Sequence, residues 1–295
     1  MNINNLSSHE NPEPVNGVLY IVGTPIGNLR DISLRALNIL KNVHLIACED
    51  TRQTKKIMTK YQFSNNLISF NKHNSLNKTP KIIEILKSEK SIALVSDAGL
   101  PSICDPGEDL IKEAKSKGIN IICIPGPCAA LTALVSSGLP SSKFTFEGFL
   151  PKKKIERKKI LMEIYDNEKT TILFESPKRL KRLLDELKEC FGGEREIQVS
   201  RELTKKFEEH IGNDINSVID YFKGKEVLGE ITIVIKGINK KGSKNSFDEV
   251  LLKRELLDLI NAGLNLSEAS KYLAKKYNLK KRLIYNIQNK ELDLN

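Results

Sequence analysis

The sequence I-A-L-V-S-D-A-G-L-P-S-I-C-D-P-G at residues 92–107 joins a short apolar run to a loop of turn-forming residues. The run at 92–95 is continuous and rich in β-branched residues, as expected of a strand buried on both faces of a parallel sheet. The loop that follows holds two aspartates, two glycines and two prolines in twelve residues. Open α/β sheets bind ligands at the carboxyl ends of their strands, so this stretch predicts a site beside Asp97, with a tight connection as the alternative.

The same strand pattern recurs on both sides of this stretch. Amphipathic segments separate the runs, and three helix starts are indicated by Asp31, by Thr79 before Pro80 and by Asp105 before Pro106. This alternation predicts a doubly wound α/β layer. The other strands expected in it lie at 18–22, 43–47, 67–70 and 120–124.

A cluster of turn residues, G-L-P-S-S at 138–142, predicts a boundary to a second α/β domain. Its expected strands lie at 144–147, 170–174, 197–200 and 230–235, and its helices at 152–165 and 177–190. Three helical patterns follow at 247–261, 266–276 and 279–288, and the last two resemble a helix-turn-helix. The predicted organisation is a flexible tail at 1–16, domains at 17–140 and 141–237, a linker at 238–246 and a helical appendage at 247–295.

Composition excludes several classes of protein. The chain has 295 residues, of which 40% are hydrophobic and 28% charged, as is usual for a globular protein. No apolar run approaches the roughly 18 residues of a membrane span. The five cysteines form no C-x-x-C pair and the four histidines are scattered. We therefore expect no disulfide framework, no metal site and a cytoplasmic location.

The net charge of +10 is localised. Residues 152–159 hold six basic side chains and one acidic one, and residues 238–295 hold twelve basic and seven acidic. Localised positive charge favours a polyanionic partner such as nucleic acid, with a solvated helix face as the alternative for 152–159.

Two further strand ends carry small residues. The first strand ends in V-G-T-P-I-G-N-L at 22–29, a spacing that differs from the G-x-G-x-x-G of dinucleotide sites, and Pro25 lacks the N–H that a phosphate cradle would use. The loop P-G-P-C-A-A at 125–130 consists of small residues, so a ligand or another part of the protein can approach its backbone closely. Each glycine loop indicates either a ligand without pyrophosphate or close packing of the protein itself, and Cys128 fits as a small packing residue.

Three charged clusters also follow expected strands: C-E-D-T-R at 48–52, F-E-S-P-K-R-L at 174–180 and S-R-E-L-T at 200–204. Glu49 and Asp50 are candidates for a base or a positioning group, and Arg52 for a phosphate contact. A solvated helix start and surface ion pairs are the alternatives. Together the clusters suggest a cleft between the two domains.

Taken in order, these motifs resemble the bacterial methyltransferases that modify a cytidine ribose of small-subunit ribosomal RNA, which belong to the tetrapyrrole methylase superfamily. The resemblance covers about residues 18–237. It implies two α/β domains with S-adenosyl-L-methionine bound in the cleft between them, and transfer of a methyl group to a ribose 2′-hydroxyl in the decoding region of 16S RNA. The small ribosomal subunit would be the partner.

The methyl transfer that the resemblance implies needs the ribose hydroxyl to be oriented, and a nearby carboxylate base would help because this hydroxyl is a poor nucleophile. The candidates for the base are Glu49, Asp50 and Glu202, and the chemistry requires no metal. RNA phosphates would be held by Arg52, Arg201, Lys152, Lys153 and Lys154, together with the C-terminal helices. Cofactor binding would involve Ile26, Asp97, Leu100, Cys128, Ala129, Phe174, Gly229 and Glu230.

Two other functions stay open at this point. One is a corrin or porphyrin C-methyltransferase of the same superfamily. The other is a DNA-binding regulator that reads DNA with its C-terminal helices. The oligomeric state is also open, with a homodimer as one alternative.

Overall fold

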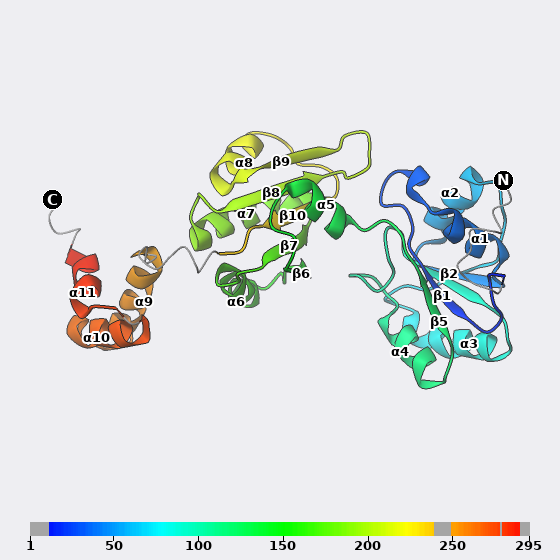
Figure 1. The fold of residues 1–295 in the computed structure, drawn as a ribbon, viewed down its shortest axis with the longest axis horizontal. Helices are drawn as coiled ribbons and strands as arrows, with labels where there is room; N and C mark the ends of the chain where they lie inside the picture. Colours follow the sequence, from blue (N-terminus) through cyan, green and yellow to red (C-terminus); the bar gives the residue numbers. More distant parts are fainter. Residues whose placement is uncertain (1–11, 239–248, 278, 290–295) are drawn as a thin grey trace. The chain divides into compact units, whose positions relative to one another are not determined.

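The computed structural model describes residues 12–238, 249–277 and 279–289. The chain divides into two compact units, Met1–Ile238 and Asn239–Asn295 (Figure 1). None of the helices in the described ranges combines the length and the apolar character that crossing a membrane requires.

The first unit contains a five-stranded parallel sheet with the strand order β3-β2-β4-β1-β5. On the interior strand β1, Tyr20 and Val22 face one hydrophobic core while Leu19 and Ile21 face another. Burial on both faces explains the continuous apolar runs and confirms the predicted α/β fold class. The strands are β1 (Leu19–Val22), β2 (Leu45–Cys48), β3 (Leu67–Ser69), β4 (Ile92–Val95) and β5 (Ile121–Ile124).

The helices of this half are α1 (Leu34–Asn42), α2 (Thr51–Lys60), α3 (Ser75–Lys87) and α4 (Glu108–Ser116), preceded by the 3₁₀ helix η2 (Leu29–Asp31). All three predicted helix starts are wrong.

Each start has a local physical reason. Asp31 ends η2, and the Ser33 hydroxyl caps α1 by accepting a hydrogen bond from the Ala36 N–H. Pro80 lies inside α3 instead of opening it. Gly107, with a φ of +148°, precedes α4, so Asp105 is not its cap. A polar residue followed by proline is therefore a weak signal for the start of a helix, because the geometry of the preceding loop decides where the helix begins.

The second sheet has the order β6-β7-β10-β8-β9, in which β6 and β7 are parallel and the other neighbours antiparallel. Its strands are β6 (Phe144–Phe149), β7 (Thr170–Glu175), β8 (Glu196–Arg201), β9 (Glu209–Asp214) and β10 (Ile231–Ile235). The helices α6 (Lys154–Tyr165), α7 (Pro177–Phe191) and α8 (Ile215–Phe222) accompany them.

Helix α5 (Ala129–Ser137) follows the last strand of the first sheet but contacts β10 and β7 of the second (Figure 1). From the sequence it is predicted to belong to the first domain, before the boundary at 138–142. Its apolar side shares a core with a loop residue of the first half, Ile26, and with residues of the second half. This core consists of Ile26, Ala130, Ala133, Leu134, Ile172, Leu203 and Val234. The two sheets are therefore joined by common packing.

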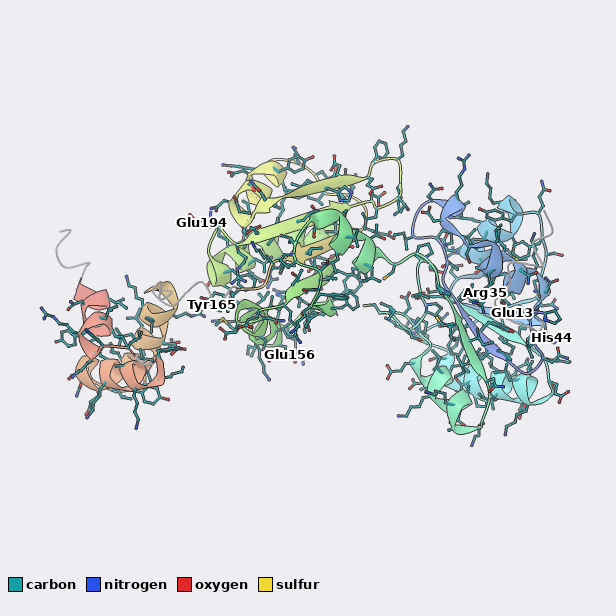
Figure 2. The ribbon with its side chains drawn as sticks, in the orientation of Figure 1. Glu13, Arg35, His44, Glu156, Tyr165 and Glu194 are labelled. Carbon is teal, nitrogen blue, oxygen red and sulfur yellow. The ribbon has the colours of Figure 1, made fainter. Side chains whose placement is uncertain are left out.

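The described part of the N-terminal segment is attached to the first half. The Glu13 carboxylate pairs with Arg35 at 2.6 Å, and both side chains are labelled in Figure 2. The Val15 N–H donates to the Tyr20 hydroxyl at 2.8 Å.

The second unit contains α9 (Glu249–Asn261), α10 (Leu266–Tyr277) and α11 (Lys281–Asn289). It has a core of its own, formed by Leu252, Leu256, Ala269, Leu273, Ile284 and Ile287. The Glu255 carboxylate ties α9 to α10 by accepting from Lys276 at 2.8 Å and from the Tyr277 hydroxyl at 2.6 Å. The predicted linker at 238–246 lies outside the described residues except for Ile238.

Candidate active site

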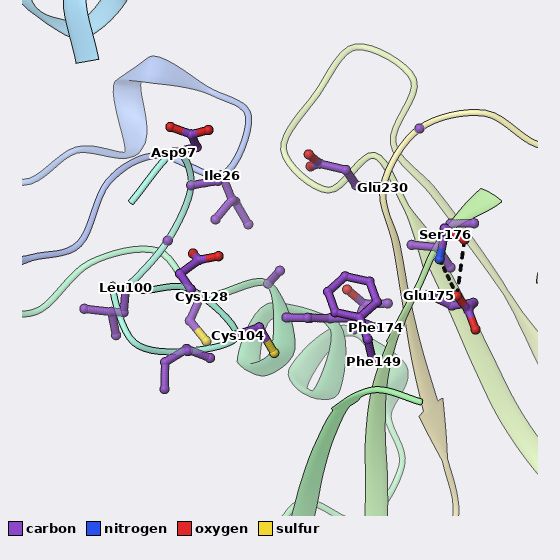
Figure 3. A pocket seen from close by; sticks show the side chains of 18 of the residues that line it. Ile26, Asp97, Leu100, Cys104, Cys128, Phe149, Phe174, Glu175, Ser176 and Glu230 are labelled. Atoms are coloured by element: carbon purple, nitrogen blue, oxygen red, sulfur yellow. Dashed lines mark hydrogen bonds between the residues drawn. The ribbon is translucent and has the colours of Figure 1, made fainter. Parts of the chain in front are cut away.

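A cavity of about 470 Å³ lies where the loop after β4 meets the ends of β7 and β10. Figure 3 shows Asp97, Leu100 and Cys128 on one side of it and Phe174 and Glu230 on the other. The structure brings all eight predicted cofactor residues to its wall. The lining consists of Ile26, Glu49, Asp97, Ala98, Gly99, Leu100, Ile103, Cys104, Asp105, Cys128, Ala129, Phe149, Phe174, Glu175, Ser176, Pro177, Gly229, Glu230, Ile231 and Thr232.

The loop after β4 is fixed by backbone contacts with the loop after β1. Thr24 and Gly99 exchange two hydrogen bonds, of 2.8 and 3.1 Å, and Gly99 has a φ of +78°. Glycine tolerates this conformation at no steric cost. The loop therefore places Asp97 at the pocket mouth, where its Oδ1 accepts the Asp50 N–H at 3.0 Å.

Three carboxylates, Glu49, Asp97 and Asp105, make this side of the pocket acidic. Burial raises the pKa of each carboxyl group, and repulsion by neighbouring carboxylates adds to the effect. Asp97 acts in this way on Glu49 and on Asp105, and Asp50 acts on Asp97. Lys72 lowers the pKa values of Glu49 and Asp105 in part, and its Nζ donates to the Cys104 carbonyl at 2.9 Å. Such a cluster favours binding of a cation, which would relieve the repulsion.

The second half supplies an apolar, aromatic wall. Phe174 packs against Phe146 and Phe149 with ring centroids 5.0 and 5.6 Å apart. Glu175 is buried beside it, but its charge is balanced by Arg179 at 3.0 Å, and it accepts the Ser176 N–H at 2.7 Å. Uncompensated negative charge is therefore concentrated on the side of Asp97, opposite the aromatic wall.

Cys128 is the N-cap of α5 and makes no side-chain capping hydrogen bond. The first N–H groups of a helix have no partner within the helix, so those of α5 face the pocket with Cys128 and Ala129 and can donate to a ligand. A thiol is a weaker acceptor than the hydroxyl of a usual cap residue, so it competes little for these donors.

Asp50 and Arg52 form a pair at the start of α2. Asp50 caps this helix, and Arg52 donates to both of its carboxylate oxygens, with the shortest distance at 2.6 Å. These bonds lower the pKa of Asp50 to about 2. A base has to line the pocket and has to be basic enough to accept a proton. Asp50 fails on both points, and Glu202 does not line the pocket either, so Glu49 is the candidate that remains.

Glu202 also lies outside the pocket lining and supports the wall instead. Its Oε1 accepts both the Glu230 N–H at 3.0 Å and Lys205 Nζ at 2.9 Å, and Lys205 also pairs with Glu230. Hydrogen bonds from these two donors offset the effect of burial and lower the pKa of Glu202. A Cβ on Gly229 would lie 2.5 Å from the Glu202 side chain, so this glycine is required for the contact.

The loop that carries Glu202 also holds the first half. The Asn28 N–H donates to Thr204 Oγ1 at 2.9 Å, and a Cβ on Gly27 would lie 2.6 Å from the same oxygen. Glu202 and Thr204 have positive φ values, of 54° and 65°, which is strained for residues other than glycine. We call residues 202–208 the clasp. Their hydrogen bond to Asn28 holds the loop that carries Ile26 on one side of the pocket, and their hydrogen bond to Glu230 holds the other side.

The glycines near the first strand thus serve packing of the protein on itself. A Cβ on Gly23 would lie 2.7 Å from the Gly126 Cα. This close approach explains the glycines at positions 23 and 126 by packing of the protein itself, whereas Ile26, Cys128 and Ala129 of the same loops line the pocket.

The predicted RNA contacts differ in their surroundings. Arg201 pairs with Glu209 at 2.9 Å and donates to the Leu228 carbonyl, so it is a poor candidate for a phosphate contact. Lys152, Lys153 and Lys154 are exposed, although Lys153 contacts Glu156 at 3.0 Å. Arg157, counted in the same basic stretch, is buried and paired with Glu186.

Several residues around the site were not assigned to it from the sequence. The sequence predicts Asp105 as a helix cap and predicts no role for Phe149, Cys104 or Thr204. Phe149 ends β6, so the rule about strand ends could have found it. Thr204 acts through tertiary contacts, for which the sequence gives no signal.

Comparisons with known proteins identify the family. The model of the Tetrapyrrole (Corrin/Porphyrin) Methylases matches residues 18–218. Ribosomal RNA small subunit methyltransferase I of Bacillus subtilis (strain 168) is 44% identical over 273 residues, which cover 92% of this chain and 93% of that protein. The protein of the same name from Thermotoga maritima is 44% identical over 221 residues, which cover 75% of this chain and 99% of that protein.

A solved structure supports the fold alone. Cobalt precorrin-4 methyltransferase, a cobalamin biosynthetic enzyme, has a TM-score of 0.58 at 14% identity, covering 75% of this chain and 95% of the other. The family match and the relatives with high coverage do not support the interpretation as a DNA-binding regulator. The chain belongs to the tetrapyrrole (corrin/porphyrin) methylase family, and within it to the group of ribosomal RNA small subunit methyltransferase I.

Proposed function

We propose that this protein transfers the methyl group of S-adenosyl-L-methionine to the ribose 2′-hydroxyl of a cytidine in the decoding region of 16S ribosomal RNA. The observation that carries the proposal is the pocket with an acidic side and an aromatic side, in a chain 44% identical to a ribosomal RNA small subunit methyltransferase over 92% of its length. The solved tetrapyrrole methyltransferases are less than 20% identical to this chain and support the shared fold, not a tetrapyrrole substrate.

The residues of the pocket fit this cofactor. A sulfonium and an ammonium group carry positive charge, which suits Asp97 and the neighbouring carboxylates. Phe174 and Leu100 offer apolar surface to an adenine ring, and the open N–H groups at the start of α5 can donate to its acceptor atoms. A cavity of about 470 Å³ is within the range of small-molecule sites.

When bound, S-adenosyl-L-methionine supplies an activated methyl group whose bond to sulfur breaks as the bond to the ribose oxygen forms. The protein has to orient the hydroxyl and accept its proton. Glu49 fits this task, because it lines the pocket and its pKa is raised by burial and by Asp105. The products are the 2′-O-methylated cytidine, S-adenosylhomocysteine and a proton that Glu49 later releases to water.

Exposed basic side chains would hold the RNA backbone. In the second unit, Lys271, Lys275 and Arg282 are exposed, and so is Tyr272, which can stack on an unpaired base. Lys152, Lys153, Lys154 and Arg52 supply further contacts, and Arg52 can exchange Asp50 for a phosphate at little cost because its side chain is 86% exposed.

We also propose that the reaction takes place in the cytoplasm, where ribosomal subunits are assembled.

We further propose that the protein forms a homodimer. The exposed apolar residues Leu131 and Val135 on α5 support self-association. Sedimentation equilibrium of the full chain and of the Val135→Lys variant tests the homodimer. A monomer at micromolar concentration would contradict it.

Transfer of labelled methyl groups tests the function. Small ribosomal subunits from a strain that lacks this protein are incubated with the purified chain and tritiated cofactor, and the labelled nucleotide is mapped. We expect one labelled cytidine, with the label on its ribose. Label on a base of the subunit RNA instead of a ribose would overturn the proposal. So would label on an added tetrapyrrole with none on the subunit.

A further inference from the structure

The helix that begins beside the pocket mouth has a solvent face formed largely by cations. Helix α2 (Thr51–Lys60) contains four basic residues and no acidic one. At 100° per residue, Arg52, Lys55, Lys56 and Lys60 fall on one side of the helix, and all four are exposed. The buried residues Thr54, Ile57 and Met58 fall on the opposite side. We call these four cations the α2 cationic face.

The lysines of this face are not neutralised within the protein. Arg52 pairs with Asp50, whereas the structure gives Lys55, Lys56 and Lys60 no carboxylate partner among the described residues. Helix α4 (Glu108–Ser116) differs, because its lysines alternate with Glu108, Asp109 and Glu113. Unpaired cations concentrate counterions, and releasing those counterions favours binding of a polyanion.

The position of this face relates it to the reaction. Glu49, which lines the pocket, is two residues before α2, and the Asp50 N–H donates to Asp97. From Arg52 to Lys60 the helix advances about 12 Å, which is long enough to contact more than one phosphate. A nucleotide with its ribose at Glu49 would have its neighbours along the strand next to α2.

We propose that the α2 cationic face binds the phosphates of the RNA strand next to the methylated nucleotide. This inference rests on the proposed function and extends it from the pocket to a specific surface for the substrate. Lys55, Lys56 and Lys60 act as point charges towards the backbone, so they hold the strand without reading its sequence.

Neutralising the three lysines tests the role of the face. The variant Lys55→Gln/Lys56→Gln/Lys60→Gln is compared with Lys112→Gln/Lys115→Gln/Lys117→Gln, which removes the same charge at α4. We expect the first variant to bind small subunits about tenfold more weakly and to lower the slope of log K against log salt by about 2, since each phosphate contact contributes about 0.7. Its cofactor affinity should equal that of the wild type, which also shows that it is folded.

Photocrosslinking tests the position of the face independently of affinity. Thr59→p-benzoylphenylalanine places the probe among the cations, and Ser116→p-benzoylphenylalanine places it on α4 as the control. We expect Thr59 to crosslink within a few nucleotides of the methylated cytidine, and Ser116 not to do so.

Each outcome bears on one claim. Equal subunit affinity and salt slope for both lysine variants, or crosslinks from Thr59 that lie far from the modified nucleotide, would overturn the role of α2 and leave the activity intact. A wild-type chain that methylates no subunit would contradict the proposed function itself.

Discussion

Among single residues, Asp97 combines a position at a strand end with a place in the pocket wall. Its Oδ1 accepts the Asp50 N–H, and the residue lines the pocket. We expect Asp97→Ala to weaken S-adenosyl-L-methionine binding by about 1–3 kcal/mol, or five- to 150-fold in Kd, the usual loss for a hydrogen bond to a charged group. Calorimetric titration measures this. An unchanged Kd in a folded variant would remove Asp97 from the cofactor contacts.

The three pocket carboxylates should couple cofactor binding to protons. Burial first, and then repulsion by neighbouring carboxylates, raises the pKa values of Glu49, Asp97 and Asp105. A bound cation stabilises the ionised forms and lowers these pKa values, so protons are released and affinity rises with pH as the carboxyl groups ionise. Titrations in two buffers of different ionisation enthalpy measure the release. The neutral product S-adenosylhomocysteine should release fewer protons, and equal release for both ligands would contradict the charge argument.

Glu49 is the residue whose substitution should separate chemistry from binding. We expect Glu49→Gln to lower kcat by about 10²–10⁴-fold, the scale for a general base, and to leave the KM for RNA nearly unchanged. In the wild type, kcat should fall as pH drops through the pKa that Glu49 has in the complex with cofactor and RNA, and this acid limb should vanish in the variant. A kcat near the wild-type value would show that Glu49 is not the base and would make Asp105, another carboxylate of the pocket, the next candidate.

At the level of elements, the sequence was most informative where burial is two-sided. The strand at 92–95 agrees with β4 at both ends, and every other strand of the first sheet was predicted within two residues, because β-branched runs buried on both faces carry a strong pattern. Strand β9 and helix α8 were missed. The edge strand β9 reads E-H-I-G-N-D and buries little, so its pattern reflects pairing with β8 and not hydrophobicity.

The clasp is the element whose contacts the sequence could not predict, and Thr204 tests it. We expect Thr204→Val, which removes the acceptor for the Asn28 N–H, to raise the cofactor Kd about fivefold, since a hydrogen bond is worth about 1 kcal/mol, and to change kcat little. Thr204→Ser keeps the hydroxyl and should bind as the wild type does. If the valine and serine variants bind the cofactor equally, the clasp does not control the pocket.

For the whole molecule, the candidate site was predictable to the extent that it follows strand ends. Asp97, Cys128 and Phe174 lie where their strands lead, whereas the distinction between Glu49, Asp50 and Glu202 required three-dimensional contacts. Each carboxylate follows a strand and looks equivalent in sequence. Only the structure shows that Glu49 lines the cavity, Asp50 caps a helix and Glu202 supports the pocket wall.

The division of the chain into two units predicts a division of labour between them. The pocket is lined entirely by residues 26–232, and the second unit has its own core. The Thermotoga maritima relative aligns over 99% of its length with only 75% of this chain, so about a quarter of this chain has no counterpart in that member of the group.

We therefore expect truncation after Lys240 to leave the cofactor Kd within about twofold of the wild type. It should weaken subunit binding at least tenfold, because exposed cations such as Lys271 and Arg282 are removed. Calorimetry and filter binding measure the two quantities on the same sample. A truncated chain that folds but loses the cofactor would show that the second unit contributes to the pocket, and one that keeps full subunit affinity would assign RNA binding to the first unit alone.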